Sequence, residues 1–295
     1  MVAKRSRSSS NANVLRPREL SLGVSLFPAR TPTLAPATHT NSYALGTREV
    51  VLDEPATPYE DEQRAWIEWA RALRGSGRTP IALFATHYHA DHVGGVDALS
   101  RELGVPLWAH DETAKRIGED KVAKRLVDGD EIVLDGVVPQ RWEVMETPGH
   151  AWGHLSLWEP ALRTLVVGDM VASVGTIVII PGDGDMKIYL EQLARLDSKG
   201  ATLALPAHGD PIDDPSAALQ RYIAHRLGRE ARVLAAVNAA GGNGSTDVDL
   251  VPVAYADTPV SAWPYALFSL RAHLIKLVAE GRVLEIDGVY RTPPG

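Results

Sequence analysis

The sequence contains no cysteine among its 295 residues. Disulfide bonds, thiolate metal ligands and a cysteine nucleophile are therefore excluded for this chain. Any metal site must be built from histidine and carboxylate side chains. A chain without cysteine fits a reducing compartment, and we expect a cytoplasmic protein.

Long apolar runs and phosphate-binding loops are also missing. No stretch approaches the roughly 18 apolar residues that cross a bilayer, so we expect no membrane association. The first residues, MVAKRSRSSS, carry basic side chains without an apolar segment behind them, which does not indicate a secretory signal. No glycine-rich phosphate loop follows a predicted strand, so a nucleotide-binding fold has no support.

The charge balance is acidic. The chain has 37 acidic residues against 30 Lys and Arg residues, a formal net charge of −7. This balance favours solubility and argues against a large sequence-independent nucleic-acid surface, although it does not exclude a local basic face. The length suffices for one large domain, or for a medium domain with a small one beside it.

Apolar runs separated by turn residues predict strands and helices in a mixed order. Helices and strands alternate at first, strands then dominate, and alternation returns, which favours two sheets with helices outside. The stretch NSYALGTREVVLDEP predicts two strands joined as a hairpin around Gly46. The predicted strands cover 20–27, 41–55, 81–87, 105–110, 125–136, 141–149, 153–160, 163–171 and 201–209, and the predicted helices cover 59–77, 93–104 and 185–200.

A change of composition after the last of these strands predicts a second domain. Proline and aspartate in HGDPIDDP mark a turn, a long helix follows over about 215–240, and AAGGNGST indicates a flexible connector. The last segment predicts a helix and then a hairpin turned at Asp287-Gly288, which is a winged-helix pattern. We expect a flexible tail at 1–17, a main domain at 18–215 and a small winged-helix-like domain at 216–295.

Three histidines and an aspartate lie within six residues in THYHADH, after the apolar run IALF. His87 and His89 are two residues apart and can point to one side of a loop that leaves a sheet edge. Asp91 and His92 begin the next helix and can point to a neighbouring position. Neutral imidazole and carboxylate are the usual ligands of zinc and similar ions, so two such positions indicate two metals.

Three more side chains of the same kind follow predicted strands. His150 lies in ETPGH, Asp169 in LVVGD and His208 in LPAH. A single histidine or aspartate after a strand is ordinarily a turn or capping residue. Seven candidates at strand ends indicate one metal site instead, made of His87, His89, Asp91, His92, His150, Asp169 and His208.

The spacing His-x-His-x-Asp-His, followed by single His, Asp and His residues, resembles the metallo-β-lactamase superfamily. With VGTIVIIPGDGDMKIYLEQL, LPAHGDPIDDP and the winged-helix-like tail, the chain is similar to the β-lactamase-like protein 2 branch. That branch includes a mitochondrial single-strand endoribonuclease and many bacterial hydrolases. The resemblance implies an α/β fold: a four-layer αββα sandwich with the site at one edge, and a small C-terminal winged-helix-like domain.

The resemblance also implies roles for the seven residues. It divides them between two Zn²⁺ ions: His87, His89 and His150 at the first, Asp91, His92 and His208 at the second, and Asp169 bridging both. Asp91 would also orient a hydroxide between the metals and shuttle its proton. Iron and manganese are alternatives, since sequence alone does not assign the metal.

Further residues are expected near the site. Asp53 matches an aspartate that supports the metal ligands from behind in this family, whereas Glu54 replaces a smaller residue of the family pattern. His154 is expected to be a structural or supporting residue. Asp183 and Asp185 in PGDGD are candidate substrate contacts, although turn chemistry explains them equally well.

The expected activity is that of a dinuclear zinc-dependent hydrolase, which uses a metal-bridging hydroxide on an ester, thioester, lactone or lactam-like small molecule. The alternative is a metal-dependent single-strand endoribonuclease, because a predicted helix carries a stripe of basic residues that could contact phosphates: Arg221, His225, Arg226, Arg229 and Arg232. A winged-helix DNA-binding regulator and an iron-dependent sulfur dioxygenase stay open, as does a homodimer.

Overall fold

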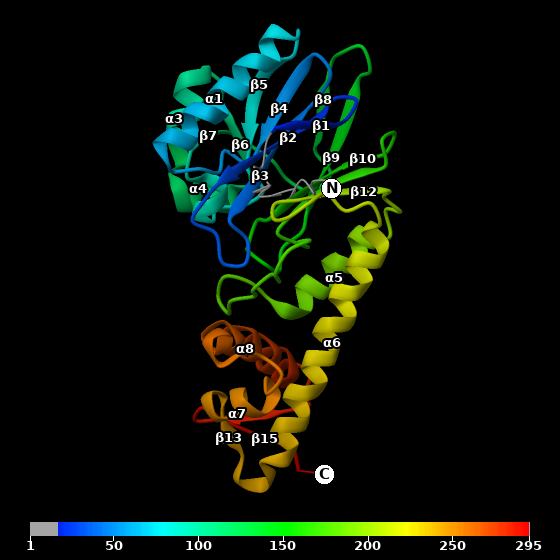
Figure 1. The fold of residues 1–295 in the computed structure, drawn as a ribbon. Coiled ribbons are helices and arrows are strands. Elements are labelled where there is room, and N and C mark those ends of the chain that lie inside the picture. Colours follow the sequence, from blue (N-terminus) through cyan, green and yellow to red (C-terminus); the bar gives the residue numbers. More distant parts are fainter. Residues whose placement is uncertain (1–16, 295) are drawn as a thin grey trace, which may run out of the picture.

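Two β-sheets face each other in the upper part of the molecule as drawn in Figure 1, and helices cover their outer faces. This computed structural model describes residues 17–294, so the tail predicted at 1–17 lies, except for Pro17, outside the described residues. Within residues 17–294, no helix is long and apolar enough to cross a membrane.

In the described part of the chain, the first sheet has seven strands in the order in which they occur along the sequence. Neighbours are antiparallel from β1 to β4 and parallel from β4 to β7. The strands are β1 (Arg18–Ser21), β2 (Val24–Arg30), β3 (His39–Leu45), β4 (Glu49–Asp53), β5 (Thr79–Phe84), β6 (Leu107–Ala109) and β7 (Val122–Arg125). The helical segments between them are α1 (Glu60–Gly75), α2 (Ala90–Val93), α3 (Val96–Leu103), α4 (Asp111–Ile117) and η1 (Glu119–Lys121).

The second sheet has five strands among the described residues, in the order β12-β11-β10-β9-β8. β11 and β12 are parallel because α5 (Met186–Asp197) crosses between them, and the other neighbours are antiparallel. The strands are β8 (Glu131–Leu134), β9 (Gln140–Glu146), β10 (Leu155–Glu159), β11 (Thr164–Gly168) and β12 (Leu203–Pro206).

Clusters of buried side chains lie between these layers. One joins the outer face of the first sheet to α1 and α3 around Trp66. A second fills the space between the two sheets around Trp142. A third joins the second sheet to α5 and to the start of α6 (Pro215–Ala239) around Tyr189. Each sheet therefore packs on helices with one face and on the other sheet with the other face, which is the four-layer αββα arrangement.

α6 leads from the sandwich into a smaller domain at the lower end of Figure 1. A fourth cluster of buried side chains joins the second half of α6 to the next helices. The strand order β13-β15-β14 forms a small sheet there. The elements after α6 are η2 (Gly241–Asn243), β13 (Ser245–Thr246), α7 (Asp247–Ala254), η3 (Val260–Ala262), α8 (Trp263–Ala279), β14 (Leu284–Ile286) and β15 (Val289–Arg291). The hairpin predicted to turn at 287–288 is confirmed by β14 and β15.

Most predicted elements are present, and the differences have local causes. The single strand predicted over 20–27 is wrong, because Gly23 has a φ of +77° and reverses the chain between β1 and β2. The sequence does not predict α4 or β7. Both bury few side chains, so their apolar residues do not recur at helical or strand spacing. It does not predict α7 either, because Pro252 lies inside that helix.

Candidate metal centre

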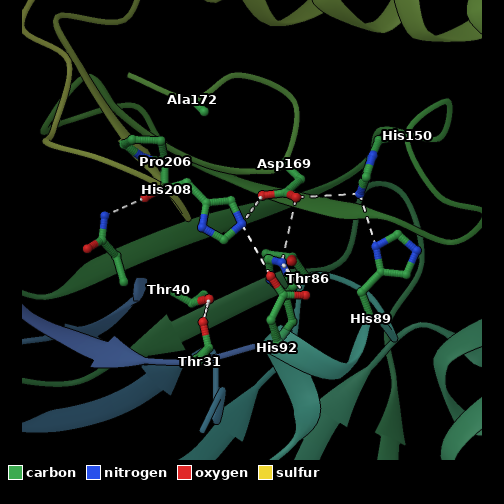
Figure 2. A network of polar contacts seen from close by, with 12 residues as sticks. Thr31, Thr40, Thr86, His89, His92, His150, Asp169, Ala172, Pro206 and His208 are labelled. Carbon is green, nitrogen blue, oxygen red and sulfur yellow. Dashed lines mark hydrogen bonds and ion pairs between the residues drawn. The ribbon is translucent and has the colours of Figure 1, made fainter. Parts of the chain in front are cut away.

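Four strands end at one edge of the sandwich, and the segments that follow them carry the predicted ligands (Figure 2). β5 leads to His87 and α2, whereas β9, β11 and β12 lead to His150, Asp169 and His208. β9 runs in the same direction as β11 and β12, because β10 is antiparallel to both β9 and β11. The carboxyl ends of these strands therefore meet, and residues far apart in the sequence come together.

Three histidines form one group. Nδ1 of His89 lies 2.8 Å from Nε2 of His87 and 3.1 Å from Nε2 of His150. The ligand atoms of all three lie within 4.8 Å of one another. Burial lowers the pKa of His150 to about 4 and holds the pKa of His87 well below its usual value. Both imidazoles are therefore neutral, the form that binds a divalent metal.

A second group consists of Asp91, His92 and His208, whose ligand atoms also lie within 4.8 Å of one another. Nε2 of His208 lies 3.5 Å from Oδ2 of Asp91, and Nε2 of His92 lies 3.7 Å from Oδ1 of the same carboxylate. Nδ1 of His208 donates to the carbonyl oxygen of His39 at 3.0 Å. In the neutral ring, this hydrogen bond leaves Nε2 of His208 as the nitrogen that can bind a metal.

Asp169 lies between the two groups (Figure 2). Its Oδ1 is 3.3 Å from Nε2 of His208, while its Oδ2 is 3.5 Å from Nε2 of His150 and 3.7 Å from Nε2 of His92. Burial alone would raise the pKa of Asp169, but His208 and His92 outweigh it and hold that pKa well below its usual value. Asp169 is therefore an ionised carboxylate that contacts both groups.

Two buried atoms in the centre have no hydrogen-bond partner among the described residues: Nε2 of His92 and Oδ1 of Asp169. Leaving a buried polar atom without a partner costs about 1–3 kcal/mol. Divalent cations would satisfy both atoms, and a donor set of imidazole nitrogens and carboxylate oxygens suits zinc, iron or manganese. The residues present therefore fit a metal site.

A buried glutamate orients one side of this site. Oε1 of Glu54 accepts hydrogen bonds from Oγ1 of Thr86 at 2.5 Å and from Nδ1 of His92 at 3.0 Å. Burial would lower the pKa of His92, but Glu54, Asp91 and Asp169 raise it well above its usual value. Glu54 itself has a φ of +53°, which residues other than glycine rarely adopt. The sequence marks Glu54 only as a departure from the family pattern, and no spacing indicates its contact with His92.

Asp53 and His154, the two residues predicted to support the ligands, are both buried. The backbone N–H of Asp169 donates to Nε2 of His154 at 3.1 Å, and Nδ1 of His154 lies 2.8 Å from Oγ1 of Thr147. His154 thereby fixes the segment that carries Asp169. Burial, together with the neighbouring Glu54, raises the pKa of Asp53 well above its usual value. That either residue affects the metal stays a prediction.

Asp183 and Asp185, the candidate substrate contacts, have partners within the protein. Oδ2 of Asp183 lies 2.7 Å from Nε2 of His89, and the hydroxyl of Tyr88 donates to Oδ1 of Asp183. Asp185 caps α5, because its Oδ1 accepts from the backbone N–H of Ile188 at 2.9 Å. That they contact a substrate stays a prediction. Asp183 thus orients the ring of His89, and the sequence does not indicate this contact.

Replacing Asp183 with alanine is expected to weaken metal binding by about tenfold, because the Nε2 hydrogen of His89 loses its acceptor. The loss is at the low end for such partners, since the Asp183 side chain is 22% exposed and water can partly replace it. Competition against a metal-chelating dye measures the affinity. Asp183→Asn keeps an acceptor oxygen and should lose less, whereas equal affinities of all three proteins would contradict this role.

The basic stripe on α6 is largely engaged within the chain. Arg226 is buried and donates to the carbonyl oxygen of Ile177. Arg229 and Arg232 both pair with Asp257. These contacts neutralise or bury three of the four arginines that could have contacted phosphates, so the contacts give no support to an RNA-binding stripe.

Comparison with known proteins leads to the same family as the residues of the site. Residues 35–208 match the metallo-beta-lactamase superfamily, and residues 246–291 match the beta-lactamase associated winged helix domain. A beta-lactamase-like protein 2 homolog of Caenorhabditis elegans is 30% identical over 252 residues, which cover 83% of this chain and 80% of that protein. An atrochrysone carboxyl ACP thioesterase of Aspergillus chevalieri is 27% identical over 259 residues, which cover 84% of this chain and 79% of that protein.

Solved structures share the fold over both domains. A metallo-beta-lactamase family protein of Thermus thermophilus has a TM-score of 0.72 at 23% identity, covering 92% of this chain and 99% of that one. A beta-lactamase domain protein of Burkholderia ambifaria has a TM-score of 0.78 at 22% identity, covering 96% of each chain. From its sequence match and its αββα layers, we conclude that the chain belongs to the metallo-beta-lactamase superfamily and ends in the winged helix domain associated with it.

Proposed function

We propose that this chain is a hydrolase of a small ester or thioester that depends on two divalent metal ions, with lactones and lactams as related substrates. The observation that carries the proposal is the position of Asp169, whose two oxygens face histidines of both groups. Members of the superfamily are generally hydrolases, and the Aspergillus chevalieri relative is named a thioesterase. A cytoplasmic location and the oligomeric state stay predictions.

The ligand assignment that we propose follows the two groups. His87, His89 and His150 would hold one ion, Asp91, His92 and His208 would hold the other, and Asp169 would serve both. We propose zinc, because imidazole and carboxylate are its usual ligands. A bound pair of such ions supplies Lewis acidity and makes water a nucleophile at neutral pH. In the reaction, water adds to the carbonyl carbon, the C–S or C–O bond breaks, and an acid and a thiol or alcohol leave.

Asp91 is the residue to which we assign proton transfer. It lines the cavity beside the site, and its side chain is 18% exposed, whereas His92 and His208 of the same group are more deeply buried. A carboxylate that faces both the ligands and the cavity can take a proton from the attacking water and return it to the leaving group. Its proximity to His208, at 3.5 Å, keeps the carboxylate in this position.

The zinc-loaded protein is expected to hydrolyse thioesters of small acids, and Asp91→Asn is expected to lower kcat by about 100-fold or more, because a positioned acid–base group contributes about 10²–10⁴-fold. A thiol-reactive dye follows the release of the thiol. Metal content must be measured in parallel, since Asp91 is also a proposed ligand. Asp213→Asn, at an exposed position between β12 and α6, is the matched control and should keep full activity.

Two results would speak against this proposal. A protein that carries about two metal ions and hydrolyses nothing in a panel of thioesters, esters, lactones and lactams would refute the acyl substrate class. Cleavage of labelled single-stranded RNA that falls steeply with salt and disappears in Asp91→Asn would favour the endoribonuclease alternative.

A further inference from the structure

A cavity of about 670 Å³ connects the metal ligands to the C-terminal domain. One end of it is lined by His89, Asp91, His150, Asp169 and His208. Its volume lies within the range of about 300–1,000 Å³ that is usual for small-molecule sites. The cavity is therefore large enough for a substrate whose reacting carbonyl lies at the metal ligands and whose remainder extends away from them.

The wall away from the metal ligands is mostly apolar. Leu34 and Pro36 come from the loop between β2 and β3, and Ala172, Ile177 and Ile180 come from the segment between β11 and α5. Among the described residues that line the cavity, none is a lysine, an arginine or a glutamate. A charged group in this part would lose its hydration without gaining a partner, so the wall suits an uncharged, apolar group.

The C-terminal domain also lines this cavity. Ala262 at the end of η3 and Tyr265 in the first turn of α8 line the same space as Ile177 and Ile180. Figure 1 shows α8 beside the green segment that leads into α5. Tyr265 is 47% exposed, so its ring belongs to the surface of the cavity rather than to the core of its own domain.

α6 fixes the segment that forms one wall. The hydroxyl of Tyr222 contacts both the backbone N–H and the carbonyl oxygen of Ala172, each at 3.1 Å. Arg226 donates to the carbonyl oxygen of Ile177, and its guanidinium carbon lies 5.5 Å from the centre of the Tyr189 ring. Because these contacts lie within the chain, α6 holds the backbone of the wall in place, and less order has to be imposed on it when a substrate binds.

We propose that this cavity binds the uncharged, apolar acyl group of the substrate, and that Tyr265 of the C-terminal domain limits the size of that group. The inference rests on the proposed acyl hydrolase and adds to it the chemical class of the acyl group and one specificity-determining residue. The winged helix domain thus forms part of the substrate site, although every proposed metal ligand comes from the sandwich.

A series of N-acetylcysteamine thioesters of straight-chain acids tests this assignment, because their leaving group is small and uncharged. Each added methylene is expected to raise kcat/KM about fourfold until the cavity is full, the ratio that corresponds to about 0.8 kcal/mol per buried methylene. A succinyl thioester should be at least about tenfold poorer than a butyryl thioester of the same length, because its carboxylate has no partner in the wall.

Tyr265→Ala is expected to move the preferred acyl group to longer or branched chains and to change the ratio of kcat/KM between long and short acyl groups by about tenfold. Tyr265→Phe should behave like the original protein, because the ring acts as an apolar surface. Val260→Ala is the matched control: Val260 lies in the same domain, is 68% exposed and does not line the cavity. It should leave the chain-length profile unchanged.

A binding measurement separates this inference from the proposed function. Calorimetry measures the affinity of the corresponding straight-chain amides for the metal-free and the metal-loaded protein. Amides that bind more tightly with each methylene, and less so in Tyr265→Ala, would uphold the cavity assignment even if no thioester is hydrolysed. Thioesters that are hydrolysed with no dependence on chain length, and equally by Tyr265→Ala, would overturn the cavity assignment and leave the hydrolase intact.

Discussion

Asp169→Ala is expected to lower kcat/KM by about 100-fold or more and to reduce the bound metal from about two ions per chain to one or fewer. Asp169 is the carboxylate that contacts histidines of both groups, so its loss would remove the one negative charge that the two proposed metal positions share. Mass spectrometry of the metal content and the kinetics of thioester hydrolysis measure the two effects on the same samples.

The control for this change is another aspartate that the site does not use. Asp213→Ala, at an exposed position after β12, should keep both the metal content and the activity. Thermal unfolding of the metal-free proteins shows whether Asp169→Ala still folds, so that a loss of structure is not mistaken for a loss of ligand. An Asp169→Ala protein that folds, keeps two metal ions and stays active would refute the shared role of Asp169.

Glu54→Ala is expected to weaken metal binding by about 10–100-fold, because a hydrogen-bonded partner behind a metal-ligating histidine contributes about this much. Without Glu54, Nδ1 of His92 and Oγ1 of Thr86 both lose their acceptor in a buried place. The His92 ring is then free to turn, and its Nε2 no longer points at the group of ligands. Competition against a chelating dye measures the affinity, and the midpoint of thermal unfolding of the metal-free protein shows the loss of the buried hydrogen bonds.

Glu54→Gln separates geometry from charge. The glutamine oxygen can still accept from Nδ1 of His92, so this variant should bind metal more tightly than Glu54→Ala but less tightly than the original protein. Glu131→Ala, in a surface pair with Arg141, is the matched control and should change neither property. If Glu54→Ala kept the original metal affinity, the orientation of His92 would have to come from the packing around its ring.

The sequence predicts those parts of the site that are encoded locally. His87, His89 and His92 lie within one short segment, and its residue types alone indicate a metal. The other candidate ligands each follow an apolar strand, so strand prediction brings them to one edge. The fold follows in the same way, because the sheets and most of the helices have clear periodicity and turn residues.

What the sequence does not predict depends on packing between distant segments. Glu54 reaches His92 because β4 pairs with β5 and because the backbone of Glu54 adopts a positive φ. The residue types at these positions predict neither the strand pairing nor the positive φ. The stripe on α6 shows the same limit. Helical spacing places Arg226 and Arg229 on one face, but it does not say that the face meets Ile177 and Asp257 rather than solvent.

The cavity is the clearest case of such a feature. Its wall combines Leu34, Ile177 and Tyr265, which come from three separate segments and two domains. No local pattern distinguishes these side chains from any other apolar residues of a loop or a helix. Only the arrangement of the elements in space shows that they line the same cavity as the proposed metal ligands.

α6 also determines how the two domains depend on each other during unfolding. Its 25 residues span roughly 37 Å, with Leu219 in the core of the sandwich and Val233 and Val237 in the core of the winged helix domain. The junction is a continuous helix, and Ala272 of α8 also packs in the cluster around Tyr189, so unfolding of the winged helix domain would expose apolar side chains of the sandwich. The stabilities of the two domains are therefore expected to be coupled, so that a mutation in the core of the winged helix domain also loosens the cavity wall that α6 holds.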